Sequence, residues 1–430
     1  MKIQKLIIFV LALAMVLSLG TFPAMADEPA SENVIFICDG AEGDGSSAES
    51  PLKPTTGNYE PGAANPDRDK DAALYQAWEK LMALGGGTIV ICGPYTLNDS
   101  NCQPIGGASA DFRMTAIEHR PFINITYTSV WNGVDYRQTN GAELILDERA
   151  HITFPTGTVL ENLTVRGTAA NGEHFIAAGL NPLTLGKGTN FIPFEEGNLE
   201  AYPMILGSFR SNAGALKDGD SNIIIDIGDE NHIGNIFGMC NGGNGKHKGN
   251  TNITVKSGNI GNIYGDSRAT SQVPQVGDIN IRLEGGIYHG VIAGVNVGFT
   301  GSCAKTVNLT ITGGDFSNCA GILDSTTNAD AVLPEVFNVD CSAATVEIAR
   351  QVKAVACAAA KLTLPEGFTE EVQPTDPPAD PTEPPADPTE GPSQPGGAEP
   401  AADHTWLLIV AIVVIVAAAV VIILVSRKKK

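Results

Sequence analysis

Apolar and polar residues alternate most regularly between residues 222 and 340. In this region an apolar–polar–apolar triplet returns every 28 residues, beginning at Ile225, Ile253, Ile281, Leu309 and Phe337. Side chains along a β-strand point alternately to its two faces, so each triplet predicts a strand with one buried face. Five such strands at a constant period predict a stack of repeated structural units.

A second motif, bounded by glycines, follows three of these strands. It spans residues 234–238, 261–265 and 290–294, and a weaker copy spans 318–321. Because glycine adopts positive φ angles without strain, we expect these glycines to form the corners between strands. Strands and corners at a constant period favour a parallel β-helix. A β-propeller would need about 40 or more residues per blade, and the Leu/Asn consensus of leucine-rich repeats is missing.

The region before the repeats contains three further motifs in a fixed order. An apolar strand at 34–38 leads into the turn Asp-Gly-Ala-Glu-Gly-Asp-Gly at 39–45. An amphipathic segment at 71–84 then leads into a strand that begins Gly-Gly-Gly-Thr at 85–88. This order resembles the N-terminal cap of the pectate-lyase-like superfamily of right-handed parallel β-helices. The chain departs from that pattern by a polar insertion at 46–70.

The resemblance covers roughly residues 33–340 and, with the repeats, predicts an all-β fold. We expect a right-handed parallel β-helix solenoid with a short N-terminal capping helix, plus one C-terminal transmembrane helix. Such a cap protects the first coil, whose strand edge and apolar end would otherwise be exposed. For residues 342–365 two interpretations stay open, a capping helix or a last irregular coil.

The two ends of the chain predict export and anchoring. Residues 1–26 have the basic start, apolar run and Ala-Met-Ala site of a secretory signal peptide. Residues 406–425 are apolar and uncharged, and are long enough to cross a bilayer as a transmembrane helix. The basic tail at 426–430 should stay in the cytoplasm. We therefore expect a single-pass cell-membrane protein with an ectodomain at 27–366 and a proline-rich stalk at 367–405.

The charge of the chain limits its partners. Its 48 acidic and 27 basic residues leave a formal net charge of −21 at pH 7, and six of the basic residues lie in the two terminal segments. A surface this acidic excludes nucleic acid as a partner and disfavours polyanions unless a cation intervenes. The expected partners are the lipid bilayer, through residues 406–425, and an extracellular polysaccharide or a surface protein.

Many members of the resembled superfamily cleave acidic polysaccharides, and this raises the question of catalysis. The four motifs of polygalacturonase-type enzymes are missing from the chain. Pectate lyases use a calcium-binding aspartate cluster and an arginine base. The nearest equivalents here are Asp218 and Asp220, and Asp266 with Arg268. Asp218 and Asp220 carry oxygen ligands of the type that calcium takes, although acidic corners of this kind are commonly just solvated. No other cofactor is expected.

Three loops of similar length, at 239–250, 266–277 and 295–305, leave successive coils at one predicted corner. Stacked on one side, they would form the wall of a groove across the coils. The groove would present Asn241, Asn244, His247, Arg268, Gln272 and Asn296. The alternative is that these segments are plain connections.

Eight cysteines follow the signal peptide, and an even count in an exported chain permits disulfides. The preferred pair is Cys38 with Cys92, because both lie in the predicted cap strands. Stacked, unpaired thiols are an equally good interpretation.

Two functions remain. The first is a surface-displayed β-helix for binding or adhesion, with glycans as the expected ligands. The alternative is a membrane-tethered polysaccharide lyase or glycoside hydrolase, for which no catalytic motif is found.

Overall fold

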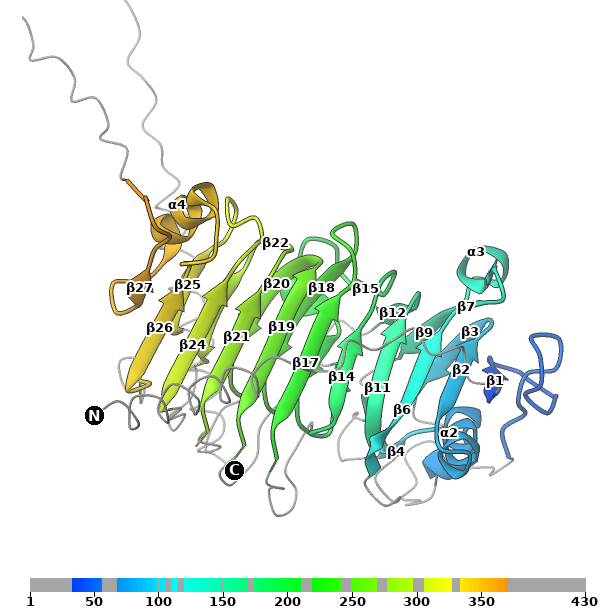
Figure 1. Ribbon diagram of the computed structural model, residues 1–430. Helices are drawn as coiled ribbons and strands as arrows, with labels where there is room; N and C mark the ends of the chain where they lie inside the picture. Colours follow the sequence, from blue (N-terminus) through cyan, green and yellow to red (C-terminus); the bar gives the residue numbers. More distant parts are fainter. Residues whose placement is uncertain are drawn as a thin grey trace, which may run out of the picture. The chain divides into compact units, whose positions relative to one another are not determined.

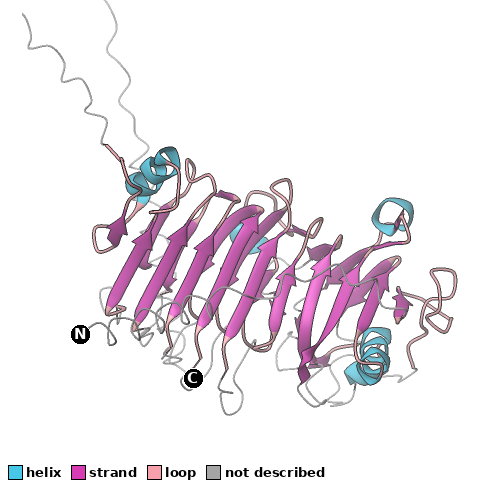
Figure 2. Cartoon of the chain, viewed as in Figure 1, coloured by secondary structure: helices cyan, strands magenta, loops and turns pink. Residues whose placement is uncertain are grey.

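The computed structural model describes the chain in twelve segments, which all belong to one compact unit. The segments are residues 33–55, 68–98, 101–104, 110–113, 120–147, 150–168, 174–209, 219–240, 249–268, 277–296, 305–326 and 333–369. The structure is mostly β, with long parallel sheets and few helices, as expected of an all-β solenoid (Figures 1 and 2).

The largest sheet has eleven strands within the described residues, and all its neighbouring strands are parallel. In spatial order these strands are β1 (Val34–Ile37), β2 (Gly87–Ile91), β6 (Arg120–Thr128), β11 (Thr156–Glu161), β14 (Pro182–Leu185), β17 (Ser221–Asp226), β19 (Thr251–Ser257), β21 (Ile279–Leu283), β24 (Thr306–Ile311), β26 (Val336–Asp340) and β27 (Lys361–Thr363).

A second sheet has ten strands within the described residues, of which β4 and β5 alone pair in antiparallel fashion. Its members are β4 (Gln103–Pro104), β5 (Ala110–Arg113), β10 (Ala150–Thr153), β13 (Phe175–Ala177), β16 (Met204–Leu206), β18 (His232–Phe237), β20 (Asn259–Tyr264), β22 (Ile287–Tyr288), β23 (Val291–Val295) and β25 (Gly321–Ser325).

Two small sheets and the helices complete the description. A four-stranded parallel sheet contains β3 (Pro94–Leu97), β9 (Glu143–Leu146), β12 (Thr164–Gly167) and β15 (Asn190–Ile192). An antiparallel hairpin contains β7 (Val130–Trp131) and β8 (Val134–Asp135). The helices are α2 (Ala73–Ala83), α3 (Tyr136–Asn140) and α4 (Val346–Val355), with the 3₁₀ turns η1 (Arg68–Asp71) and η3 (Leu199–Ala201).

From β17 to β26 the chain passes back and forth between the eleven-stranded and the ten-stranded sheet, with β22 and β23 both in the ten-stranded sheet. We call one strand of the eleven-stranded sheet, with the strand or strands of the ten-stranded sheet that follow it, a coil. Figure 1 shows the coils side by side, in sequence order from β17 to β26. Residues about 28 to 30 apart in sequence therefore occupy equivalent places in neighbouring coils.

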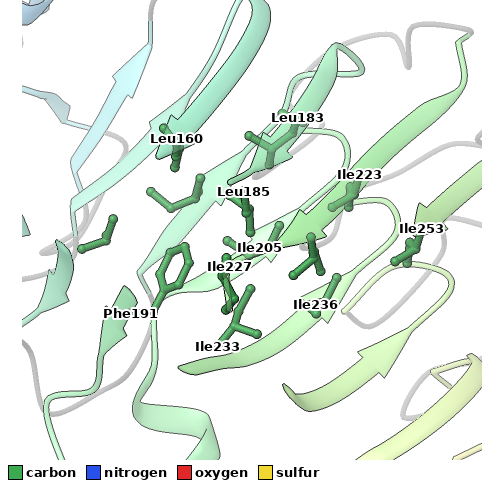
Figure 3. Packing of buried hydrophobic residues seen from close by; sticks show 14 of the residues in the cluster. Leu160, Leu183, Leu185, Phe191, Ile205, Ile223, Ile227, Ile233, Ile236 and Ile253 are labelled. Carbon is green, nitrogen blue, oxygen red and sulfur yellow. The ribbon is translucent and has the colours of Figure 1, made fainter. Parts of the chain in front are cut away.

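The core consists of columns of apolar side chains, each contributed by the same position of successive coils. One column, with every member fully buried, consists of Ile152, Ile176, Ile205, Ile236, Ile263, Ile292 and Ile322. Figure 3 shows part of the interior, where Ile205 and Ile236 lie among residues from the facing strands. Each residue thus buries apolar surface against its equivalents in the coils on either side.

The 28-residue period predicted from the triplets is confirmed for the middle coils and wrong by two residues at both ends. Ile253 pairs with Ile281, 28 residues on. However, Ile253 pairs on its other side with Ile223, and Leu309 pairs with Val339. These steps are 30 residues long. A shift of two residues leaves the same face of a strand buried, so the alternation pattern alone cannot detect it.

Some of the repeated glycines adopt positive φ angles, and others allow close packing of the backbone. The positive φ angles were predicted at the wrong glycines. The positive φ angles of the repeat region belong to Gly228, Gly258, Gly286 and Gly314, not to the glycine-bounded motif. Within that motif glycine is needed for close packing. A Cβ atom added to Gly261 would lie 2.6 Å from the carbonyl oxygen of Gly234 in the preceding coil, closer than Cβ contacts occur. The motif marks places where two backbones approach each other.

The N-terminal end of the solenoid is covered as the resemblance predicts. Backbone hydrogen bonds join the free edge of β1 to the turn: Phe36 N donates to Gly45 O (2.9 Å) and Leu52 N donates to Phe36 O (2.8 Å). The start of the predicted insertion therefore belongs to the cap. Helix α2 covers the core beneath, and Leu74 N near its start donates to the Tyr95 hydroxyl (3.0 Å) in place of a side-chain N-cap.

Within the cap turn, Asp44 fixes the backbone of the following residues. Its carboxylate accepts hydrogen bonds from the backbone N–H and hydroxyl of Ser46 and from the hydroxyl of Ser50. These hydrogen bonds lower the pKa of Asp44 to about 2. The negative charge is therefore stabilised more in the folded turn than in the unfolded chain.

This shift predicts an acid-sensitive cap. Because the folded pKa lies below the unfolded value near 3.8, the contribution of Asp44 is present above that pH and is lost as the pH falls towards about 2. We expect the stability difference between the wild type and Asp44→Asn to shrink over that window, as measured by denaturant unfolding at each pH. A difference that stays constant from about pH 5 to about pH 2 would contradict this role.

Residues 342–365 contain both of the elements that the sequence left open. Helix α4 begins after Thr345, whose hydroxyl accepts a hydrogen bond from Ile348 N (3.3 Å), and it buries Ala349 and Val352. Strand β27 then adds to the eleven-stranded sheet beside β26. The far end of the solenoid is therefore covered by a helix and extended by one short strand.

The predicted signal peptide (1–26), basic tail (426–430) and transmembrane segment (406–425) lie outside the described residues, as does the stalk from residue 370 onwards. Among the helices that the structure does describe, none has the length and apolar character needed to cross a bilayer.

Candidate functional site

The predicted groove lies at the corner that follows strands β18, β20 and β23 of the ten-stranded sheet. Cys240, Arg268 and Asn296 come after these strands, and Arg268 N donates to the backbone carbonyl of Cys240 in the preceding coil (2.9 Å). Of the residues predicted to line the groove, Asn241, Asn244, His247 and Gln272 lie outside the described residues.

The other two predicted groove residues, Arg268 and Asn296, lie next to each other. The Asn296 side-chain amide donates to the backbone carbonyl of Arg268 (2.9 Å), and Thr326 of the next coil donates its hydroxyl proton to Asn296 Oδ1 (2.9 Å). Thr326 was not predicted, although it lies 30 residues after Asn296. We call these three residues the corner line.

The corner line is supported by a buried carboxylate. Asp266 is fully buried, and its Oδ1 accepts a hydrogen bond from Asn296 N (2.6 Å). The backbone carbonyl of Asp266 accepts from Met239 N in the preceding coil (3.1 Å). Asp266 therefore holds the backbone at the corner, which is a structural reason for an aspartate next to Arg268.

The Phe175 ring contacts the Arg268 side chain. The guanidinium carbon lies 5.6 Å from the centroid of the Phe175 ring, within the range of a cation–π contact. Phe175 and Phe237 belong to one small apolar cluster, and Tyr264 packs against this cluster. The rings of Phe237 and Tyr264 are stacked, with their centroids 4.8 Å apart. Contacts with Phe175 and the bonded backbone restrict the directions that the Arg268 side chain can take.

The structure also contains a row of stacked asparagines on the outer face of the eleven-stranded sheet. Each side-chain amide donates to the asparagine before it, at 2.9–3.0 Å. The members of this asparagine ladder are Asn222, Asn252, Asn280, Asn308 and Asn338, and all are half-buried. Sequence reasoning missed it, although steps of 28 and 30 residues between asparagines are a recognisable signal.

The ladder leaves hydrogen-bonding capacity unused. An amide has two N–H donors and two acceptor lone pairs, and each contact with a neighbour uses one of them. An inner member such as Asn280 therefore retains one donor and one lone pair. Because strands of a sheet lie about 4.8 Å apart, the face offers such a group at regular intervals along the solenoid.

The predicted metal ligands are only partly described. Asp218 lies outside the described residues. Asp220 is exposed and its carboxylate accepts a hydrogen bond from Asn250 N (2.8 Å), while Asn250 Oδ1 accepts from Asp278 N (2.9 Å) in the next coil. Asp220 thus begins a row of contacts between coils. Among the described residues, no three His, Cys, Asp or Glu side chains are grouped as metal ligands would be.

Cys38 and Cys92 follow the neighbouring strands β1 and β2, and both are free thiols in the structure. Burial is the largest cause that raises the pKa of Cys92 to about 12, and charge repulsion from the nearby Cys38 raises it further. Burial also raises the pKa of Cys38. Both thiols are therefore protonated at neutral pH and poor nucleophiles. The disulfide between them stays a prediction.

Comparison of the chain with protein-family models, curated proteins and solved structures finds no match.

Proposed function

We propose that the protein is a membrane-anchored, surface-displayed β-helix that binds extracellular glycans. We also infer that the solenoid is the right-handed parallel β-helix of the pectate-lyase-like superfamily. The sheets are consistent with this assignment, and the capped first strand and helix α2 match the quoted motifs. Right-handed connections between parallel strands are the rule in proteins.

The asparagine ladder is the observation that carries the binding proposal. Neutral amides suit the hydroxyl groups of a sugar, which both donate and accept hydrogen bonds. Their regular spacing across five strands suits an extended polymer that contacts several coils at once. The net charge of −21 disfavours a polyanionic chain, so a neutral polysaccharide is the favoured ligand.

The corner line supplies the second set of contacts. Arg268, Asn296 and Thr326 come from three successive coils, at the ends of strands of the ten-stranded sheet. Arg268 adds one positive charge and a planar set of donors that suit hydroxyl or carbonyl oxygens. A polymer crossing the coils near this corner would meet amide, hydroxyl and guanidinium groups in turn.

The predicted ends support a location of this surface outside the cell. A cleaved signal peptide at 1–26 would export the chain, and the segment 406–425 would anchor it in the bilayer. The proline-rich stretch would then act as a semi-rigid spacer that holds the ectodomain away from the membrane. We propose this arrangement as the setting for glycan binding.

The test is a binding assay with the full chain in detergent micelles on immobilised neutral and acidic polysaccharides, with and without calcium. We expect Asn280→Ala to weaken binding to a neutral polysaccharide about tenfold, which corresponds to about 1.4 kcal/mol. Gln138→Ala removes an exposed amide of α3, far along the sequence from the ladder, and serves as the control.

Equal binding by the two variants would contradict a role of the ladder. The same incubations report on the enzymatic alternative. New reducing ends or unsaturated products in the supernatant would replace the binding proposal by a tethered hydrolase or lyase.

A further inference from the structure

A column of polar side chains runs through the interior of the solenoid, and it belongs to no site described above. Ser221 and Thr251 are paired across β17 and β19, and both are fully buried. Pro182 of the preceding coil pairs with Asn222, so Asn181, one residue earlier, occupies the place equivalent to Ser221. One coil before that, Thr158 pairs with Leu183, so Thr156, two residues earlier, occupies the place equivalent to Asn181.

All four residues of this polar column carry a buried oxygen without a hydrogen-bond partner in the described part of the chain. The atoms are the hydroxyl oxygens of Thr156, Ser221 and Thr251, and Oδ1 of Asn181. The Asn181 amide nitrogen is used, because it donates to the carbonyls of Phe154 and Ala178 (3.0 Å each). Buried polar groups are almost always paired, so four unpaired oxygens in one column need a partner.

The later coils fill the same position with the apolar side chains of Ile279, Val307 and Phe337. On one side the column packs closely against glycines: a Cβ atom added to Gly207 would overlap Ser221 Oγ, and one added to Gly238 would overlap Thr251 Cγ2. A partner of the unpaired oxygens therefore lies between neighbouring members of the column and not on the glycine side.

The spacing of the column matches the reach of one water molecule. One water molecule can form two hydrogen bonds of about 2.8 Å at a tetrahedral angle. The two oxygen atoms that it joins are then about 4.6 Å apart. Neighbouring strands lie about 4.7–4.9 Å apart. A water between successive members could thus bond to both, and a file of waters would pair all four oxygens.

We propose that the polar column binds a file of ordered water molecules inside the solenoid. The three hydroxyl groups can each donate and accept, and the Asn181 carbonyl accepts, so a chain of waters suits the full set. A metal cation suits it less, because the column is neutral and hydroxyl protons would be left without acceptors.

The sign of a stability change tests the proposal in the full-length chain. If water pairs the Thr251 hydroxyl, Thr251→Val removes a partner of that water, and we expect the unfolding midpoint to fall by about 2–4 °C. Ser221→Ala should act in the same direction. If the column is dry, both substitutions remove an unpaired hydroxyl and leave the midpoint unchanged or raise it, which would overturn the proposal.

Val307→Thr calibrates the measurement, because it adds a hydroxyl of the same shape to the same column where its neighbours are apolar. Val307→Thr should lower the unfolding midpoint by at least as much as Thr251→Val does. A crystal structure that resolves ordered solvent gives a second readout, independent of variant stability. Density peaks between successive column members are expected. An empty column, or a peak with the short distances of a bound cation, would refute the assignment.

Discussion

Trp78→Ala is expected to lower the free energy of unfolding by about 3–5 kcal/mol, as for other buried aromatics reduced to alanine. Trp78 lies in α2, is fully buried and packs near Tyr75, with ring centroids 6.2 Å apart. Its removal leaves a cavity beneath the cap, where the first coil has no further coil to pack against. Denaturant unfolding followed by circular dichroism measures the loss.

Leu84→Ala is the control for this change. Leu84 follows the same helix but is 60% exposed, so its truncation removes little buried surface and should change stability by less than about 0.5 kcal/mol. Equal losses in the two variants would show that α2 does not cover the core as described. Trp78→Phe should fall between them because the phenyl ring fills part of the space.

Gly265→Ala is expected to cost about 2–3 kcal/mol through overpacking between coils. An added Cβ would overlap the side chain of Ile279 and lie 2.5 Å from the carbonyl oxygen of Gly294. Neither contact is with the far end of a flexible side chain, so the coils must move apart. The midpoint of thermal or denaturant unfolding reports the effect.

Gly321→Ala is the matched control, because Gly321 also belongs to the ten-stranded sheet. Its added Cβ would come no nearer than 3.5 Å to Leu323, an ordinary contact, and its φ angle is not positive. This substitution should be close to neutral. If Gly321→Ala is as destabilising as Gly265→Ala, the cost would come from glycine replacement in general and not from close packing of the backbones.

The repeating pattern predicted much of the fold because it reports burial directly. Strands around Ile253, Ile281 and Leu309 are present, and the predicted cap helix at 71–84 is observed as α2 at Ala73–Ala83. The errors are of one kind. The steps to Ile223 and Val339 are two residues longer than predicted, and this change is invisible to alternation, since it keeps the same side chains buried.

Site residues were harder to predict, because they depend on which coils lie side by side. Arg268 and Asn296 were expected to share a groove, and the structure brings them together; Thr326 and the asparagine ladder were not expected. A single asparagine in a strand carries no signal, and it becomes part of a ladder only when the register aligns it with its equivalents.

By itself, the sequence determined the local and periodic properties of this protein: alternation, a repeat of about 28 residues, a capped N-terminal end and an acidic, glycine-rich composition. Only the tertiary structure decided the register between coils, and with it the asparagine ladder and the polar column from Thr156 to Thr251. It also decided which glycines bend the chain and which allow close backbone contact. Periodicity records which face of a strand is buried, whereas the neighbours of each side chain depend on how long every loop between coils is.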